Sequence, residues 1–201
     1  MNLKPLNLTG QYVRLEPLVL SHLAGLQEAV VDGELWKLWY TMVPHPDQMA
    51  AEIERRLGLQ TQGSMLPFTV FDVQRQQVAG MTTFMNIDSA NRRLEIGSTW
   101  YRQSVQRSAL NTEAKRLLLG HAFEAQQCIA VEFRTHVFNQ QSRRAIERLG
   151  AHLDGILRQH QINQHPLADQ TLRDTCVYSI LDHEWPNVKF HLDHQLSRNR
   201  H

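Results

Sequence analysis

Cysteine is scarce in this sequence, with only Cys128 and Cys176 among 201 residues and no Cys-x-x-Cys spacing. A disulfide framework is therefore excluded, and a reducing compartment is the simplest setting. Long apolar runs are missing too, since none approaches the roughly 20 residues that cross a bilayer. The first residues also lack the apolar core of a secretory signal. We therefore expect a cytoplasmic protein with no membrane partner.

Neither sign of charge dominates. The 21 lysines and arginines nearly balance the 20 aspartates and glutamates, which leaves a formal net charge of +1. Proteins that depend on nucleic acid for their binding usually carry a broad basic surface, so we expect no such partner. The 11 histidines do not combine with acidic residues or cysteines at metal-ligand spacing, so we also expect no metal site.

Repeats, low-complexity segments and glycine–serine linkers are absent as well. With 42% hydrophobic residues, the chain is long enough for one ordinary core and short for two. We therefore expect residues 1–201 to form a single domain, with a helical C-terminal tail from about residue 184.

Hydrophobic periodicity and turn residues predict strands that alternate with helices. Strands are expected at Tyr12–Leu18, Phe68–Val73, Gln77–Ile87, Arg92–Tyr101, Cys128–Val137, His152–His160 and Arg173–Leu181. Helices are expected at Leu23–Val30, Met49–Gln62, Asn111–Ala125 and Gln141–Leu149, with Ser21 and Asp47 as caps of the first two and Gly63 and Gly150 as C-terminal stops. This order predicts an α/β or α+β protein with a mixed sheet between helices.

The junction between strand Arg92–Tyr101 and the following helix has a recognisable chemistry. A polar loop leads directly into the helix, and Asn111 or Thr112 can cap its first turn. The first N–H groups of a helix lack intrahelical partners and lie at the positive end of the helix dipole. The junction is therefore predicted to bind an anion, most simply a phosphate group.

Several segments together resemble a known family: LLLGHAFE after this loop, VEFRTHVFNQQSRRAIERLGA from Val131, then ILRQH, LRDTCVYSIL and EWP. The chain resembles the GNAT-fold N-acetyltransferases, and within them the RimJ/RimL-like branch, named for enzymes that acetylate N-termini of ribosomal proteins. The resemblance implies acetyl-CoA as donor and an amine as acceptor. It also implies a mostly antiparallel sheet that is splayed between its fourth and fifth strands, with helices on both faces.

The loop departs from the family pattern Gln/Arg-x-x-Gly-x-Gly/Ala. Its residues, which the resemblance makes the candidates for binding the CoA phosphates, are Gln106, Arg107, Ser108, Ala109, Leu110, Asn111 and Thr112. Ala109 replaces the first glycine, which allows close approach of the backbone to phosphate. We therefore expect weakened CoA binding, for which a phosphate contact from Arg107 could compensate.

Two carboxylates are candidates for the general base that takes the proton of the acceptor amine. Glu95 and Glu132 lie on the two strands that would flank pantetheine. Burial of Glu132 in an otherwise apolar strand would raise its pKa toward a useful value. The alternative is that either carboxylate is solvated or ion-paired, for example Glu132 with Arg134. A backbone N–H near the end of strand Arg92–Tyr101 would bind the developing oxyanion.

The helix after strand Cys128–Val137 supplies the remaining cofactor candidates. By resemblance, Asn139 would bond the pantetheine amides and Ser142 would donate a proton to the leaving thiolate. Arg143 could meet the CoA phosphates. The alternatives are ordinary helix capping by Asn139 and a charged helix face that includes Arg143.

An aromatic group precedes the second helix. In the family this region lines the acceptor site, so Trp36, Trp39 and Tyr40 are candidates for contacting the acceptor. Their i, i+3, i+4 spacing would equally produce a stripe that faces the core of the protein.

The sequence therefore predicts an enzyme that transfers acetyl to a primary amine, with a protein N-terminus as the leading acceptor. The alternatives are acetylation of a small-molecule amine and a CoA-binding sensor or interaction module without catalysis. The apolar residues of Val188–Leu196 could dock on a second copy, which makes a homodimer a candidate.

Overall fold

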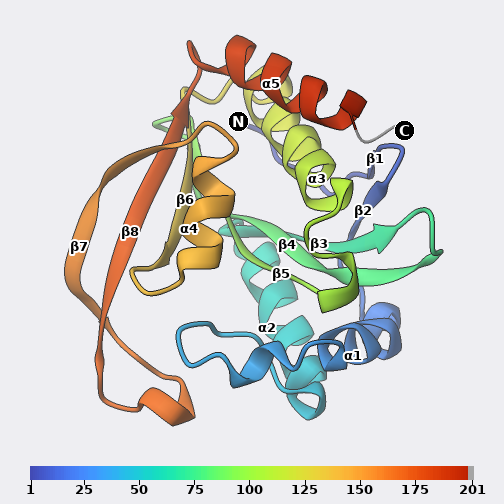
Figure 1. Cartoon of the computed structure of the whole chain (residues 1–201), viewed down its shortest axis with the longest axis vertical. Coiled ribbons are helices and arrows are strands. Elements are labelled where there is room, and N and C mark those ends of the chain that lie inside the picture. Colours follow the sequence, from blue (N-terminus) through green and yellow to red (C-terminus); the bar gives the residue numbers. More distant parts are fainter. Residues whose placement is uncertain (199–201) are drawn as a thin grey trace.

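The computed structural model describes residues 1–198 and contains one mixed β-sheet (Figure 1). The strands follow the order β1-β2-β3-β4-β5-β6-β8-β7, and all neighbours are antiparallel except β5 and β6. The strands are β1 (Leu8–Thr9), β2 (Val13–Pro17), β3 (Met65–Asp72), β4 (Gln77–Asp88), β5 (Arg93–Tyr101), β6 (Ala130–His136), β7 (His152–Ile162) and β8 (Leu172–Leu181). Each predicted strand is present, and the short β1 adds to them.

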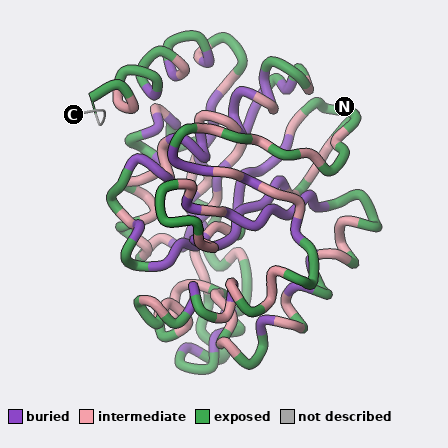
Figure 2. Tube along the Cα trace, turned by 90° about the vertical axis from the view of Figure 1, so that its right-hand side faces the viewer, coloured by how far each residue is buried: buried purple, intermediate pink, exposed green. Residues whose placement is uncertain are grey.

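Helices cover both faces of the sheet, as predicted (Figure 1). On one face, α1 (Leu23–Val31) and α2 (Met49–Thr61) pack on Met81 and Trp100. On the other face, a larger apolar cluster includes residues of α3 (Ala109–Gly120), α4 (Gln140–Glu147) and α5 (Trp185–Arg198). The short helical turns are Leu20–His22, Leu35–Lys37, Pro46–Gln48, Gln103–Val105, His121–Ala125 and Pro166–Ala168. Figure 2 shows buried stretches through the middle of the molecule and exposed stretches at its periphery.

Helix α3 begins earlier than predicted. Its N-cap is Ser108 rather than Asn111 or Thr112, and the Ser108 Oγ accepts a hydrogen bond from the Leu110 N–H at 3.3 Å. The helix extends toward the loop because Ala109 and Leu110 are buried in the core. The first-turn N–H groups therefore lie nearer to β5 than the sequence indicates.

The caps predicted for α1 and α2 are wrong as well. Ser21 and Asp47 each lie inside a short 3-10 turn that precedes the helix. His22 and Gln48 consequently occupy the N-cap positions, and neither makes a side-chain capping hydrogen bond. By contrast, Gly150 adopts a φ of +98° and its N–H donates to the Glu147 carbonyl, as expected for a helix stop.

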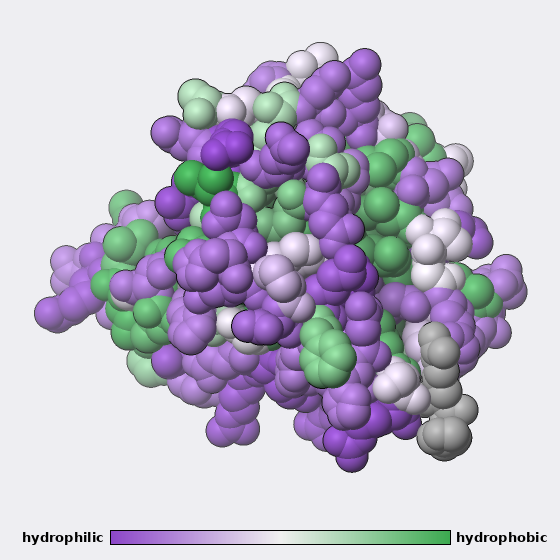
Figure 3. Space-filling model, turned by 90° about the horizontal axis from the view of Figure 1, so that it is seen from above, coloured by the Kyte–Doolittle hydropathy of each residue, from purple (hydrophilic) through white to green (hydrophobic). Residues whose placement is uncertain are grey.

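The C-terminal helix α5 confirms the predicted helical tail, but its apolar side packs on the core of the same chain. Val188 and Leu192 are buried in the same core cluster as α3, so they do not offer a surface to a second copy. Seen from above, the molecule is mostly hydrophilic with separate hydrophobic patches (Figure 3). Among residues 1–198, no helix has both the length and the apolar character to cross a membrane.

The parallel junction between β5 and β6 is short. Only three residue pairs join the strands, and the last pair is Glu95 with Glu132. Strand β5 continues to Tyr101 and β6 continues to His136, but these later residues do not pair across the junction. The two predicted carboxylates, Glu95 and Glu132, therefore lie side by side on one face of the sheet, at the point where the pairing of β5 and β6 ends.

Lys115 of α3 is buried without a counter-charge. It is 6% exposed, and its Nζ donates to the hydroxyls of Thr99 at 3.1 Å and Thr82 at 3.3 Å. No carboxylate within residues 1–198 forms an ion pair with it. Burial therefore lowers the pKa of Lys115 to about 7, because the charged form loses its hydration.

We predict that Lys115→Met stabilises the protein, and that the gain depends on pH. The unfolded chain binds the lysine proton up to about pH 10.4, whereas the folded chain releases it near pH 7, so the wild type gains stability as pH rises between these values. At pH 6–7 the substitution should add about 2 kcal/mol, or roughly 4–8 °C in Tm. Urea unfolding at pH 6.5 and 9.5 measures the gain, which should shrink at the higher pH. An equal gain at both values would contradict the assignment.

Candidate active site

The loop before α3 brings the predicted phosphate-binding residues to one end of β5. Arg107 adopts a left-handed conformation with φ of +60°, which favours glycine. The side chain of Gln106 bridges two elements: its Nε2 donates to the Tyr101 carbonyl at 3.1 Å, and its Oε1 accepts from Gln141 of α4 at 2.9 Å. Gln106 therefore links the end of β5 to the first turn of α4.

The residues at the start of α4 have defined partners. Asn139 is the N-cap, and its Oδ1 accepts a hydrogen bond from the Ser142 N–H at 3.0 Å, which confirms the capping interpretation. The Ser142 hydroxyl makes no hydrogen bond to any residue of the described part of the chain. Arg143 turns toward β8, where its Nε donates to the Tyr178 hydroxyl at 3.0 Å. Its Nη1 also donates to the Val137 carbonyl at 3.3 Å.

The two carboxylates at the β5–β6 junction differ in their surroundings. Both oxygens of Glu132 are ion-paired, Oε1 with Arg93 at 2.7 Å and Oε2 with Arg134 at 2.9 Å. The alternative interpretation of Glu132 as an ion-paired strand residue is thus confirmed. In Glu95, both polar contacts involve Oε2, which accepts a hydrogen bond from Asn86 Nδ2 at 2.7 Å and lies 3.5 Å from Arg134 Nε. The Oε1 of Glu95 has no hydrogen-bond partner within residues 1–198.

Glu95 is buried, at 5% exposure. Burial raises its pKa above the ordinary glutamate value, although the Asn86 hydrogen bond and the positive charge of Arg134 oppose the shift. Gly97 leaves space beside it, since a Cβ there would lie 2.7 Å from Oε1. Glu95 is therefore the carboxylate with a free oxygen and an increased affinity for protons.

A buried arginine on α2 holds the backbone just beyond Glu95. The β4–β5 register shifts near Ser98, which has a φ of +46°. Both Nη atoms of Arg56 donate to the Ser98 carbonyl, at 3.2 and 3.3 Å, and Nη1 also donates to Thr83 Oγ1 at 2.8 Å. Glu52 pairs with the Arg56 Nε at 2.7 Å and offsets the burial of its charge. Neither Arg56 nor Asn86 belongs to a motif in the sequence, because both act through tertiary contacts.

The aromatic residues after α1 do not form a core-facing stripe. Trp36, Trp39 and Tyr40 lie in turns rather than one helix, and all three are only partly buried. Trp39 packs edge-on against Tyr40 and against His136 of β6, with ring centroids 5.5 and 5.1 Å apart. Phe138 stacks on His136 at 5.6 Å. We call Trp39, Tyr40, His136 and Phe138 the ring cluster.

Trp36 lies outside the ring cluster. Its ring packs against His45 at 5.2 Å, and its carbonyl is 2.9 Å from the Nε2 of His165 near the tip of the β7–β8 hairpin. This contact joins the segment after α1 to the far end of β7 and β8. Trp36 therefore tethers the segment that carries Trp39 and Tyr40.

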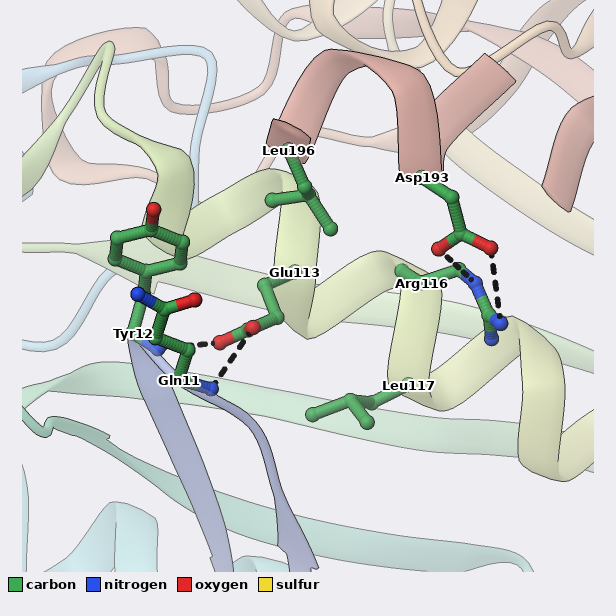
Figure 4. Close-up of a pocket in the computed structure, with 7 residues that line it drawn as sticks. All are labelled: Gln11, Tyr12, Glu113, Arg116, Leu117, Asp193 and Leu196. Atoms are coloured by element: carbon green, nitrogen blue, oxygen red, sulfur yellow. Dashed lines mark hydrogen bonds and ion pairs between the residues drawn. The ribbon is translucent and has the colours of Figure 1, made fainter. Parts of the chain in front are cut away.

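Two cavities lie away from these residues. One of about 310 Å³ lies between α3, α5 and the chain before β2 (Figure 4). There Glu113 accepts the backbone N–H of Gln11 at 2.9 Å, and Arg116 pairs with Asp193 at 2.8 Å. Another of about 630 Å³ lies between the end of α4 and α5. None of the predicted site residues lines either cavity, and the described residues hold no group of three potential metal ligands.

Comparisons with known proteins agree with this fold. The family described as "Acetyltransferase (GNAT) domain" matches residues 13–152. A GCN5-related N-acetyltransferase from Brucella melitensis is 30% identical, with a TM-score of 0.84 over 96% of this chain and 86% of that one. Mycobacterium smegmatis RimJ in complex with CoA-disulfide is 22% identical, with a TM-score of 0.75 over 96% and 93% of the two chains, which supports the fold alone.

A curated relative matches a shorter part of the chain. YdaF of Bacillus subtilis (strain 168), whose name ascribes to it ribosomal N-acetyltransferase activity, is 30% identical over 112 residues. The match spans 56% of this chain and 58% of YdaF, so it covers little more than half of that relative.

Together with the family match, the mixed sheet with one parallel junction and the helix that begins beside it identify the fold as that of an acetyltransferase. The family match covers more than half of the sequence. The chain belongs to the GNAT family, and it is an N-acetyltransferase.

Proposed function

We propose that this enzyme transfers the acetyl group of acetyl-CoA directly to a primary amine, and that the acceptor is the α-amine of a protein N-terminus. The observation that carries the proposal is the free Oε1 of buried Glu95 at the end of the β5–β6 pairing. An α-amine has a pKa of about 7.7–8.0, against about 10.4 for lysine, so a single carboxylate with a raised pKa is an adequate base. The name of YdaF, a ribosomal N-acetyltransferase, supports a ribosomal acceptor.

The chain has the features needed to hold the cofactor. The first-turn N–H groups of α3 are suited to bind phosphate, and Arg107 adds a positive charge beside them. The Ala109 methyl group is buried in the core, so it does not occupy the surface from which a phosphate would approach. The expected weakening by Ala109 is therefore small, which favours an active enzyme over a CoA-binding module without catalysis.

The chemistry is divided among four groups of the chain. Acetyl-CoA supplies an activated acetyl group as a thioester. Glu95 takes a proton from the amine through Oε1, directly or through a water molecule, as the new C–N bond forms. Backbone N–H groups of β5 beyond Glu95 stabilise negative charge on the carbonyl oxygen. Ser142 donates a proton to the departing sulfur, and Asn139 positions the pantetheine chain through its amide.

The proposal predicts selective binding of the two CoA species. Acetyl-CoA and CoA at a hundred times their Kd should stabilise the protein by about 2.7 kcal/mol, or roughly 5–10 °C in Tm. ATP at the same concentration should give no comparable shift. Thermal denaturation with each ligand measures binding, and mass spectrometry of N-terminal peptides and small amines measures transfer. Failure of saturating CoA to raise Tm would contradict the cofactor site, and transfer only to small amines would contradict the acceptor.

A further inference from the structure

The ring cluster is open to solvent on one side. Phe138 is 64% exposed, and Trp39 and Tyr40 are only partly buried. The rings come from two segments that are far apart in the sequence, the turns after α1 and the end of β6. An exposed group of large rings is unusual on a protein surface unless something packs on it.

His136, at the centre of the cluster, contributes a polar group without a partner. Its Nδ1 accepts a hydrogen bond from the Phe138 N–H at 3.1 Å, which places the proton of the neutral ring on Nε2. This Nε2 is buried and makes no hydrogen bond within residues 1–198, in a residue that is only 3% exposed. Burial, assisted by the positive charge of Arg173 and opposed by Asp174, lowers the pKa of His136 and favours the neutral ring. Buried donors normally have an acceptor, so one is missing here.

The position of His136 indicates what that acceptor is. Alternation along β6 puts Glu132, Arg134 and His136 on one face, and Glu95 lies across from Glu132. Four residues of strand separate His136 from this pair by about 13 Å. An extended peptide advances about 3.3–3.6 Å per residue, so a peptide with its amine at Glu95 needs about four steps and reaches the ring cluster with its fourth or fifth residue. A small amine cannot span this distance.

We propose that the ring cluster is a peptide subsite of the acceptor. Trp39, Tyr40 and Phe138 hold a large apolar side chain at the fourth or fifth residue, and the Nε2–H of His136 donates to a backbone carbonyl of the same peptide. The subsite rests on the proposed function, since it requires an amino terminus bound at Glu95. Its consequence is selection among protein N-termini by a residue beyond the one that is acetylated.

The test compares the amidated peptides Ser-Ala-Ala-Ala-Ala-Ala, Ser-Ala-Ala-Phe-Ala-Ala and Ser-Ala-Ala-Ala-Phe-Ala as acceptors at saturating acetyl-CoA. At least one phenylalanine peptide should have a KM about tenfold lower than the alanine peptide, with a similar kcat. Phe138→Ala should remove this advantage, so that the three peptides have similar KM values. Phe190→Ala is the matched control, because it removes a ring that is 75% exposed on α5.

The role of His136 is tested separately. His136→Leu removes the donor and should raise KM for all three peptides about tenfold, whereas His136→Gln keeps an N–H and should restore part of the loss. The Tm and its increase with CoA report whether each variant is folded. Equal KM values for the three wild-type peptides, or equal effects of Phe138→Ala and Phe190→Ala, would overturn the subsite alone. Acetylation of a small amine but of no peptide would overturn both the subsite and the N-terminal acceptor.

Discussion

Glu95→Gln should lower kcat/KM for an amine acceptor by about 100-fold, with the affinity for CoA unchanged. The amide cannot take the amine proton, although it fills the same space beside Asn86 and Gly97. In the wild type, kcat/KM should fall as pH drops through the raised pKa of Glu95, because only the carboxylate acts as a base. Steady-state kinetics between pH 5.5 and 9, with CoA binding measured alongside, test both statements.

Glu132→Gln is the matched control, since it changes the neighbouring carboxylate on the same face. Both Glu132 oxygens are already ion-paired, so this variant should lose less than about tenfold in kcat/KM. Stability gives a second readout. Because the folded pKa of Glu95 is raised, its carboxylate costs stability as pH rises above the unfolded value, and Glu95→Gln should not lower Tm at pH 7. Equal kinetic losses in the two variants would refute Glu95 as the base.

Glu113→Ala should be the most destabilising single change, at about 4 kcal/mol or roughly 8–16 °C in Tm. The carboxylate of Glu113 accepts three backbone N–H groups: those of Gln11 at 2.9 Å, Tyr12 at 2.6 Å and Val13 at 2.9 Å. Substitution by alanine removes the acceptor that these three N–H groups share at the start of β2, where Tyr12 and Val13 are buried. Urea unfolding followed by circular dichroism measures the loss.

Asp193→Ala provides the comparison, because Asp193 lines the same cavity (Figure 4). It breaks the ion pair with Arg116 in a more exposed position, where such pairs contribute about 0–1 kcal/mol. Glu113→Gln keeps one acceptor oxygen and should fall between the two. A loss from Glu113→Ala no greater than that from Asp193→Ala would show that the start of β2 does not depend on this carboxylate.

The sequence was sufficient for the family, the helices and the longer strands, because periodicity and the motifs of residues 131–151 extend over many residues. The sequence predicted the bounds of helices and strands less reliably where a single tertiary contact determines them. Ser108 rather than Asn111 begins α3 because the core buries Ala109 and Leu110, and no local signal reports that burial. β1 is two residues long and exists only by pairing with β2, so it escaped prediction.

In the candidate site too, the sequence indicated candidate residues, but only tertiary contacts show which of them are available for chemistry. The sequence offered both Glu95 and Glu132 as bases and predicted burial for Glu132, whereas the structure buries Glu95. Only the arginines and Asn86 that surround the two carboxylates distinguish the free one from the ion-paired one. The helical spacing of Trp36, Trp39 and Tyr40 suggested one face, whereas the fold places Trp36 against His45 and the other two against His136. His136 carried no sequence signal of its own, since a histidine near a strand end is usually structural.

The short β5–β6 junction has a mechanical consequence. Hydrogen bonds over only three residue pairs join the antiparallel half made of β1 to β5 to the half made of β6 to β8. Most of the cohesion between the halves therefore comes from the continuous apolar cluster beneath α3, α4 and α5. Apolar packing is non-directional, so small rotations of one half against the other break few bonds. We therefore expect relative rotation of the two halves of the sheet to centre on the β5–β6 junction, which lies beside Glu95.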